Sequence, residues 1–149
     1  MKLFQIEEPD GSPADPEAPG AAIGIDAGGE LAEVAFSVGG NAMILGDREG
    51  FERPLLVPGP EAPLANWQTL FEGAKLRAER ALARPVTHAV LVFAAPLDPA
   101  LAAELLQASE AAGIELLRLV ATDDLDANVS PVEVAAMLAE EMAPRPPAL

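Results

Sequence analysis

Cysteine is absent from this 149-residue sequence, and histidine occurs once, at position 88. Without cysteine the chain has no disulfide and no thiolate ligand for a zinc or iron–sulfur site. His88 has no second histidine or cysteine with which to build a metal site, so we expect a hydrogen-bonded structural role for it. Three of the serines stand at no spacing from His88 that suggests nucleophilic catalysis: Ser37, Ser109 and Ser130. The sequence therefore predicts no metal site and no catalytic residue.

Basic residues and long apolar runs are also scarce. The chain has 9 Lys and Arg against 24 Asp and Glu, which gives a net charge of −15. Such a surface repels phosphate backbones and anionic membranes. No apolar run reaches the roughly 18 residues of a membrane span, and the first residues lack the basic and then apolar order of a signal peptide. We therefore expect a cytoplasmic protein that binds neither nucleic acid nor membrane.

Length and proline distribution predict one domain with flexible ends. Residues 1–20 combine a short strand, Lys2–Ile6, with an acidic, proline-rich linker. Residues 21–143 form the single domain, and residues 144–149 are a frayed tail. A second proline-rich stretch covers residues 47–63, where residues 54–57 add an edge strand.

The chain is organised around residues 21–45. A compact apolar strand over residues 22–25 ends on Asp26, and Gly28-Gly29 allows a tight turn. From Leu31 the pattern alternates, with one face made of Ala32, Val34, Phe36 and Val38. Gly39-Gly40 is a two-residue hairpin signal, and residues 41–45 form the returning strand. This segment therefore predicts an antiparallel unit of three strands.

Helices and strands alternate after that unit. A helix is predicted over residues 64–83, and four of the nine basic residues lie toward its C-terminal end: Lys75, Arg77, Arg80 and Arg84. These basic residues either interact with the helix dipole or form a docking patch for an acidic partner. Buried strands follow at residues 89–94 and 116–120, separated by a helix that begins at Pro99 after the cap Asp98 and ends at Gly113.

The last predicted helix begins after Ser130, which forms a capping box with Glu133, and it ends at Pro144. Residues 123–128 before it form one helical turn or a loop. Because the strand–helix–strand unit takes a right-handed crossover, its strands lie parallel. The fold class is therefore α/β, with a mixed sheet flanked by helices.

Three stretches resemble the actin-like ATPases, and DnaK-type chaperones in particular. Residues 24–32, GIDAGGELA, are similar to the family's first phosphate loop, G-I-D-L-G-T-T-N-S. Residues 3–9, LFQIEEP, resemble the L-L-Q-I-S-E-P start of HscA-type chaperones, which are specialised for iron–sulfur cluster assembly. Residues 86–127 follow the family's order downstream, most closely at AGIELLRL, residues 112–119. The resemblance implies a ribonuclease-H-like fold, one half of an actin-like ATPase.

The same resemblance implies a degenerate nucleotide site. Asp26 matches the aspartate that organises magnesium, and Asp26, Gly28 and Gly29 are vestigial phosphate-loop positions. Gly29 and Glu30 stand where the family has two threonines that approach the phosphates. Thr122 stands in place of the glutamate that positions the attacking water. The family's second phosphate loop and its adenosine site have no counterpart in the sequence, so no bound cofactor is expected.

The resemblance thus predicts a non-catalytic DnaK/HscA-like binding module, accessory to iron–sulfur cluster assembly or to its chaperone. Its partners are then iron–sulfur assembly or chaperone proteins, or a second copy that docks through the helices after Asp98 or Ser130. Two alternatives stay open. One is a metal-dependent nuclease or phosphohydrolase on a ribonuclease-H-like fold, with Asp26, Glu72 and Asp123 or Asp124 as ligands. The other is a self-assembling structural protein.

Overall fold

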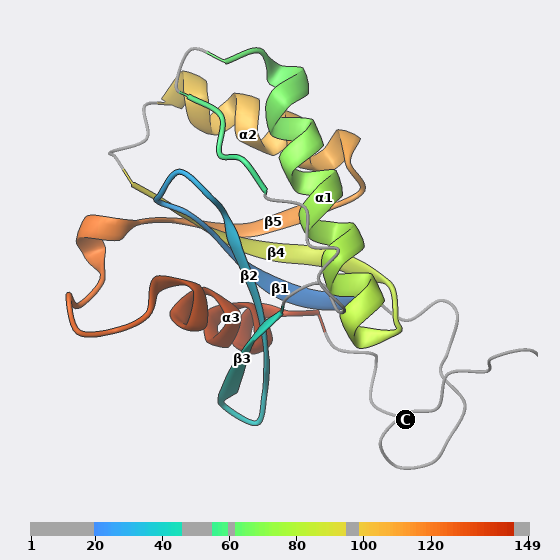
Figure 1. Cartoon of the computed structure of the whole chain (residues 1–149), viewed down its shortest axis with the longest axis vertical. Coiled ribbons are helices and arrows are strands. Elements are labelled where there is room, and N and C mark those ends of the chain that lie inside the picture. The colour runs from blue at the N-terminus through green and yellow to red at the C-terminus, as the bar shows by residue number, and fades with distance from the viewer. Residues whose placement is uncertain (1–19, 46–54, 60–61, 95–98, 145–149) are drawn as a thin grey trace, which may run out of the picture.

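The computed structural model describes residues 20–45, 55–59, 62–94 and 99–144. Its elements are β1 (Ala21–Ala27), β2 (Glu33–Val38), β3 (Asn41–Leu45), α1 (Leu64–Leu82), β4 (Val86–Phe93), α2 (Pro99–Ala111), β5 (Glu115–Ala121), the 3₁₀ turn η2 (Thr122–Asp124) and α3 (Pro131–Met142). They form three layers (Figure 1), with α1 and α2 on one face of the sheet and α3 on the other. The predicted α/β class, a mixed sheet flanked by helices, is confirmed.

The sheet has five strands in the order β3-β2-β1-β4-β5. β1, β2 and β3 form the predicted antiparallel unit, while β4 lies parallel to both β1 and β5. Gly39 and Gly40 make the hairpin turn between β2 and β3, with φ values of 61° and 81° that suit glycine. The central strand is therefore β1, which has an antiparallel neighbour on one side and a parallel neighbour on the other.

Alternation along β1 divides its side chains between the two helical layers. Ile23 and Ile25 are buried toward α1 and α2, so Gly24 and Asp26 point toward the α3 side. α3 lies directly on the backbone of Gly24, where a β-carbon would stand 2.3 Å from the backbone nitrogen of Ala136. Only glycine allows the helix and the strand to approach this closely.

β2 is covered on both faces. Ala32 and Val34 are buried beside α1 as the alternation predicts, but Val38 is 62% exposed because it lies at the hairpin end of the strand. On the opposite face Ala35 and Ser37 are buried against α3. The strand thus contributes to two cores.

The larger core lies between the sheet and the helices α1 and α2. One apolar stripe of α1 is buried there, at Trp67, Leu70, Phe71, Ala74 and Ala78. The rings of Trp67 and Phe93 are tilted with centroids 5.7 Å apart, which joins α1 to the end of β4. α1 ends at Leu82, and Ala83 takes the left-handed cap conformation with φ 55°, one residue before the predicted end.

The strand–helix–strand unit agrees with its prediction except in burial. β4 is buried along most of its length but begins earlier than predicted, at Val86, and α2 ends before Gly113, whose φ is 83°. β5 was predicted to be buried, yet Val120 is its one buried residue, because β5 is an edge strand with a single neighbour. The predicted cap Asp98 lies outside the described residues.

α3 begins at Pro131 as predicted, but the capping box does not form. The side chain of Ser130 makes no cap hydrogen bond. Proline lacks one of the N–H groups that a cap satisfies, and the Val134 N–H donates to the Ser130 carbonyl at 3.0 Å. The helix start is therefore held by backbone and proline rather than by the predicted side chains.

A short extended segment, residues 55–58, lies antiparallel beside residues 30–32, just before β2. We call this segment the strap. Leu56 pairs with Leu31 in an antiparallel bridge, which agrees with the predicted edge strand. The predicted strand Lys2–Ile6, the linker up to residue 19 and the tail from residue 145 lie outside the described residues. Within the ranges given above, no helix is long and apolar enough to cross a membrane.

Candidate functional site

The parallel strands β1, β4 and β5 end at one edge of the sheet, at Ala27, Phe93 and Ala121. In open α/β sheets, ligands bind at this carboxyl edge, in the loops that follow the strands. The loops that the structure describes here are residues 28–32 after β1 and the turn η2 after β5. This edge therefore holds the predicted phosphate-loop positions.

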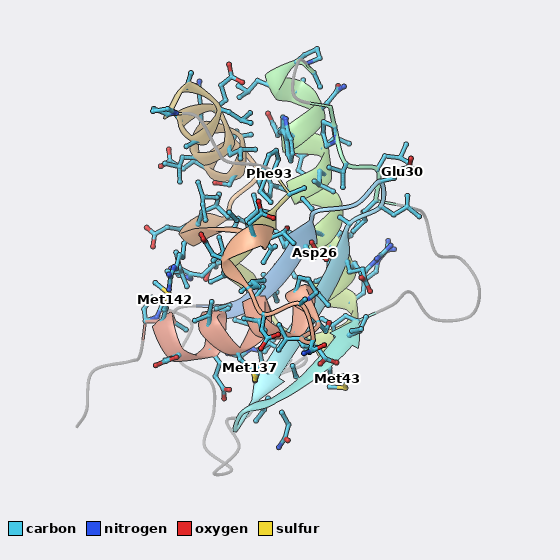
Figure 2. All side chains as sticks on the ribbon, turned by 90° about the vertical axis from the view of Figure 1, so that its left-hand side faces the viewer. Asp26, Glu30, Met43, Phe93, Met137 and Met142 are labelled. Atoms are coloured by element: carbon cyan, nitrogen blue, oxygen red, sulfur yellow. The ribbon has the colours of Figure 1, made fainter. Side chains whose placement is uncertain are left out.

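Asp26 closes the turn that follows its own strand. Its Oδ1 accepts the Gly28 N–H at 2.8 Å. The backbone N–H that would otherwise face an anion is thus already bound by a carboxylate two residues earlier. Asp26 is half-buried and lies near the middle of the sheet edge (Figure 2).

Thr122, the first residue after β5, contacts the turn that follows β1. A β-carbon at Gly28 would lie 3.0 Å from Asp26 Oδ1 and 3.1 Å from Thr122 Oγ1, so the three residues are in close contact. The Thr122 hydroxyl donates to the Phe93 carbonyl at 3.1 Å, which joins η2 to the end of β4. The Gly28 N–H and the Thr122 hydroxyl at this edge therefore each have a partner within the protein.

Gly29 and Glu30 lie at the outer end of the turn. A β-carbon at Gly29 would meet only the Leu31 carbonyl oxygen, at 3.9 Å, so this position is open. Glu30 is exposed and lies apart from Asp26 (Figure 2), while its carbonyl accepts the Val57 N–H of the strap at 2.9 Å. The structure thus brings Asp26 and Gly28 together with Thr122 and leaves Gly29 and Glu30 in solvent.

The residues of the alternative metal site are not brought together. Glu72 is exposed on α1, across the sheet from Asp26, and its carboxylate accepts a hydrogen bond from Gln68 at 3.2 Å. Asp123 and Asp124 are exposed in η2. Among the described residues, no group of three or more His, Cys, Asp or Glu side chains could hold a metal ion.

His88 has the hydrogen-bonded role predicted for it. Its Nδ1 lies 2.7 Å from Thr87 Oγ1, and its Nε2 lies 3.3 Å from Glu115 Oε2. Because Glu115 starts β5 and His88 lies near the start of β4, the contact joins the two neighbouring strands at the edge opposite the candidate site.

The four basic residues considered as a docking patch, Lys75, Arg77, Arg80 and Arg84, differ in their surroundings. Arg77 is buried, with 8% exposure. Lys75 donates to the Gly113 carbonyl at 3.2 Å and lies 3.9 Å from Glu79, so it ties α1 to the end of α2. Arg80 and Arg84 remain exposed, and only Arg80 lies in the last turn, where a helix dipole would act on it.

One polar cluster was missed by the sequence analysis. Glu140, on α3, accepts hydrogen bonds from the Ser37 hydroxyl at 2.8 Å and from the N–H groups of Gly39 and Gly40 at 2.5 Å and 3.0 Å. We call this set the hairpin clamp. The glycine turn was predicted, but nothing local indicated which acid, about a hundred positions later, would bind it.

No protein-family model matches the chain, and no curated protein matches it.

Proposed function

We propose that this chain is a non-catalytic DnaK/HscA-like binding module, built on a ribonuclease-H-like half of an actin-like ATPase whose nucleotide site is degenerate. The observation that carries the proposal is the closed carboxyl edge of the parallel strands. There the Gly28 N–H is bound by Asp26 and the Thr122 hydroxyl is bound by Phe93. A phosphate would have to break these bonds before it gained any of its own.

The sheet topology supports the fold part of the proposal. Three antiparallel strands come first in the chain and are followed by a parallel strand–helix–strand unit, with the last helix on the opposite face. A ribonuclease-H-like half of an actin-like ATPase would have this order of elements. The GID sequence ends β1 at the centre of this sheet, where the family places its first phosphate loop.

Charge at the turn supports the loss of nucleotide binding. Glu30 stands where the resemblance implies a threonine, and its carboxylate would lie near a bound triphosphate. Two like charges repel each other. Glu30 is exposed, so solvent screens its charge, yet the interaction lowers affinity at any dielectric constant.

Calorimetric titration of the full chain with Mg-ATP tests the loss of the nucleotide site. We expect no heat of binding, and an active DnaK-type chaperone in the same buffer serves as the positive control. The variant Glu30→Thr, which removes the charge and restores one hydroxyl, is the matched comparison. Micromolar affinity in the unmodified chain would contradict the proposal.

The proposed partners are iron–sulfur assembly or chaperone proteins of the cytoplasm. The tagged full chain would be used as bait in its native cell, with an unrelated protein of similar negative charge as the control. We expect an assembly or chaperone protein to be enriched over that control, and iron–sulfur enzyme activities to fall when the gene is deleted. Unchanged activities together with no such partner would reject this function.

We also propose that the chain forms a homodimer through the outer side of α3. Met137 and Met142 are 39% and 40% exposed on this helix (Figure 2). Exposed methionines are adaptable apolar contacts. Light scattering should give the mass of two chains, and Met137→Glu should restore that of one; a monomer at high concentration would reject the dimer.

A further inference from the structure

The strap has one backbone edge that is paired and one that is not. On the inner side, the Leu55 carbonyl accepts the Ala32 N–H at 2.7 Å, and the Val57 N–H donates to the Glu30 carbonyl at 2.9 Å. In an extended segment, successive residues turn their backbone groups to opposite sides. The N–H and C=O of Leu56 therefore point outward, away from the sheet.

Leu56 is accessible at this outer side. Its exposure is 70%, the highest of the exposed large apolar residues. In the part of the chain that the structure describes, neither its N–H nor its C=O has a backbone partner. The next outward position is Pro58, which has no N–H to offer. Within residues 55–58, the outer edge thus presents a single N–H donor, that of Leu56.

A pocket of about 280 Å³ lies beside this edge, between the strap and α1. It is lined by Leu55, Leu56, Pro58, Asn66, Thr69 and Leu70. Its volume is slightly below the range of small-molecule sites, roughly 300 to 1,000 Å³, and suits one apolar side chain. Leu55 and Leu70 supply the apolar wall, while Asn66 and Thr69 of α1 supply polar groups at its rim.

The surroundings of the strap are acidic. Glu30 and Glu33 are exposed on either side of Leu31, the residue that pairs with Leu56. Leu31 is itself 54% exposed, so an apolar surface lies between two carboxylates. The chain as a whole carries a net charge of −15, and a partner with basic residues is therefore favoured in both approach and binding.

We propose that the strap binds a short, extended, basic segment of a protein partner as an added strand. One residue of that segment exchanges both backbone hydrogen bonds with Leu56, and its side chain lies beside that of Leu56, on the same face of the sheet as Leu31. The next residue points to the other face and places an apolar side chain in the pocket. Lysine or arginine side chains at its ends meet Glu30 and Glu33. This recognition mode is β-strand addition; it rests on the proposed function as a binding module and names its surface.

A second copy of this chain is a poorer occupant. Two copies that pair strap to strap would bring the exposed Glu30 and Glu33 of both chains to the same edge. Pro58 also prevents the strap from continuing a ladder of hydrogen bonds, as proline does on edge strands that avoid self-pairing. Both features favour a short, oppositely charged segment.

The test titrates the full, isotope-labelled chain with the acetylated and amidated peptide Lys-Val-Leu-Val-Lys and follows its amide NMR signals. We expect saturable shifts at Leu56, Thr69 and Leu70. The same peptide with both lysines replaced by glutamate should bind at least tenfold more weakly. Shifts confined to another surface, or equal binding of both peptides, would overturn the proposal.

Two variants separate the backbone contact from the side chain. Leu56→Pro removes the one outward donor and leaves both inner hydrogen bonds of the strap intact, so it should raise the dissociation constant about tenfold or more. Leu56→Ala keeps the donor and should raise it less. Thr69→Phe narrows the pocket and should also weaken binding, while thermal unfolding confirms that each variant is folded. Unchanged binding by Leu56→Pro would exclude strand addition.

The outcomes also separate this proposal from the proposed function. Signals at Leu56 that shift with protein concentration, without peptide, would identify a second copy as the occupant and overturn the proposal. If the peptide binds at the strap but no iron–sulfur or chaperone partner is found in the cell, strand addition at the strap is supported and the proposed DnaK/HscA-like function is rejected. If a captured partner binds the Leu56→Pro variant with the same affinity as the unmodified chain, the proposed function is supported and binding at the strap is rejected.

Discussion

Two glycine turns in this molecule are each held by a carboxylate, and they differ in how far along the chain that carboxylate comes from. Asp26 holds the turn after β1 through one bond to Gly28, two residues away. Glu140 holds the β2–β3 turn from α3 through three donors, Ser37, Gly39 and Gly40. The first contact forms wherever β1 and its turn form. The second exists only when α3 is in place on the sheet.

The two turns also differ in how close they lie to the buried apolar core. The Asp26 turn lies at the carboxyl edge of the central strand, whose residues Ile23 and Ile25 are fully buried. The hairpin turn lies at the end of β2 and the edge strand β3, and Val38 next to it is exposed. The hairpin clamp thus replaces the apolar cover that the outer turn lacks.

The largest expected effect comes from Gly24→Ala, which separates the two turns. The new β-carbon would stand 2.3 Å from the Ala136 nitrogen and 2.6 Å from the Ala135 carbonyl carbon. Because both are backbone atoms, α3 must move away, and the free energy of unfolding should fall by about 3 kcal/mol, the upper part of the usual range for overpacking. Urea unfolding measures this loss.

The same variant tests which turn depends on α3. The NMR amide signals of Gly39 and Gly40 should shift strongly, while that of Gly28 stays near its position. Gly59→Ala is the matched control, because nothing lies within 4 Å of a β-carbon there. Equal shifts at both turns would show that the Asp26 turn also depends on the helix.

Glu140→Ala should have the next largest effect. It leaves three donors without their acceptor, and Ser37 is only 2% exposed, so water cannot replace the carboxylate at that hydroxyl. The loss of the acceptor for the buried Ser37 hydroxyl costs about 1 to 3 kcal/mol, whereas water can replace it at the exposed N–H groups of Gly39 and Gly40. Glu141→Ala, an exposed neighbour on the same helix, should change the stability little in the same urea experiment. Equal losses in the two variants would remove any special role for the hairpin clamp.

The contrast between the turns also explains what could be predicted from the sequence. Strand, aspartate and glycine follow one another in GIDAGG, so the turn after β1 and the two-glycine hairpin were both predicted from neighbouring residues. Glu140 is one of several acids in α3, of which only Glu133 was assigned a role from the sequence. Its partner depends on how α3 lies across the sheet, which no local pattern records.

The same limit applies to the strands and the candidate site. β5 has an apolar sequence like β4, but its burial depends on its place at the edge of the sheet, and the prediction of a buried strand was wrong. Asp26 and Gly28 were predicted as neighbours in one turn. That Thr122 would meet them, through its bond to Phe93, followed from the parallel arrangement of β1, β4 and β5 and not from spacing.

Gly28→Ala and Gly29→Ala together test how closely the two glycines of the Asp26 turn are confined. The β-carbon of Gly28→Ala would stand 3.0 Å from Asp26 Oδ1 and 3.1 Å from Thr122 Oγ1, so both side chains must shift. We expect a loss of about 1 kcal/mol, at the low end of overpacking costs, because side chains adjust where a helix backbone cannot. Gly29→Ala should be neutral, since its β-carbon meets only the Leu31 oxygen at 3.9 Å. Calorimetric melting of both variants checks this; equal effects would show that Gly28 is not specially confined.

The smallest effect is expected for Asp26→Asn, and it is best measured beside Glu140→Gln. Asp26 uses one oxygen, Oδ1, toward Gly28, so an amide can turn its own oxygen to the same N–H. Glu140 uses both oxygens, Oε2 toward Gly39 and Oε1 toward Ser37 and Gly40. An amide has one oxygen, so at least one donor of the hairpin clamp must then face an NH₂ group. Since a hydrogen bond to a charged acceptor is stronger than one to a neutral acceptor by about 1 kcal/mol, Asp26→Asn should cost no more than that, and Glu140→Gln about twice as much. Urea unfolding at constant ionic strength gives both values, and a greater loss at Asp26 would mean that its charge has a role in the fold beyond the turn.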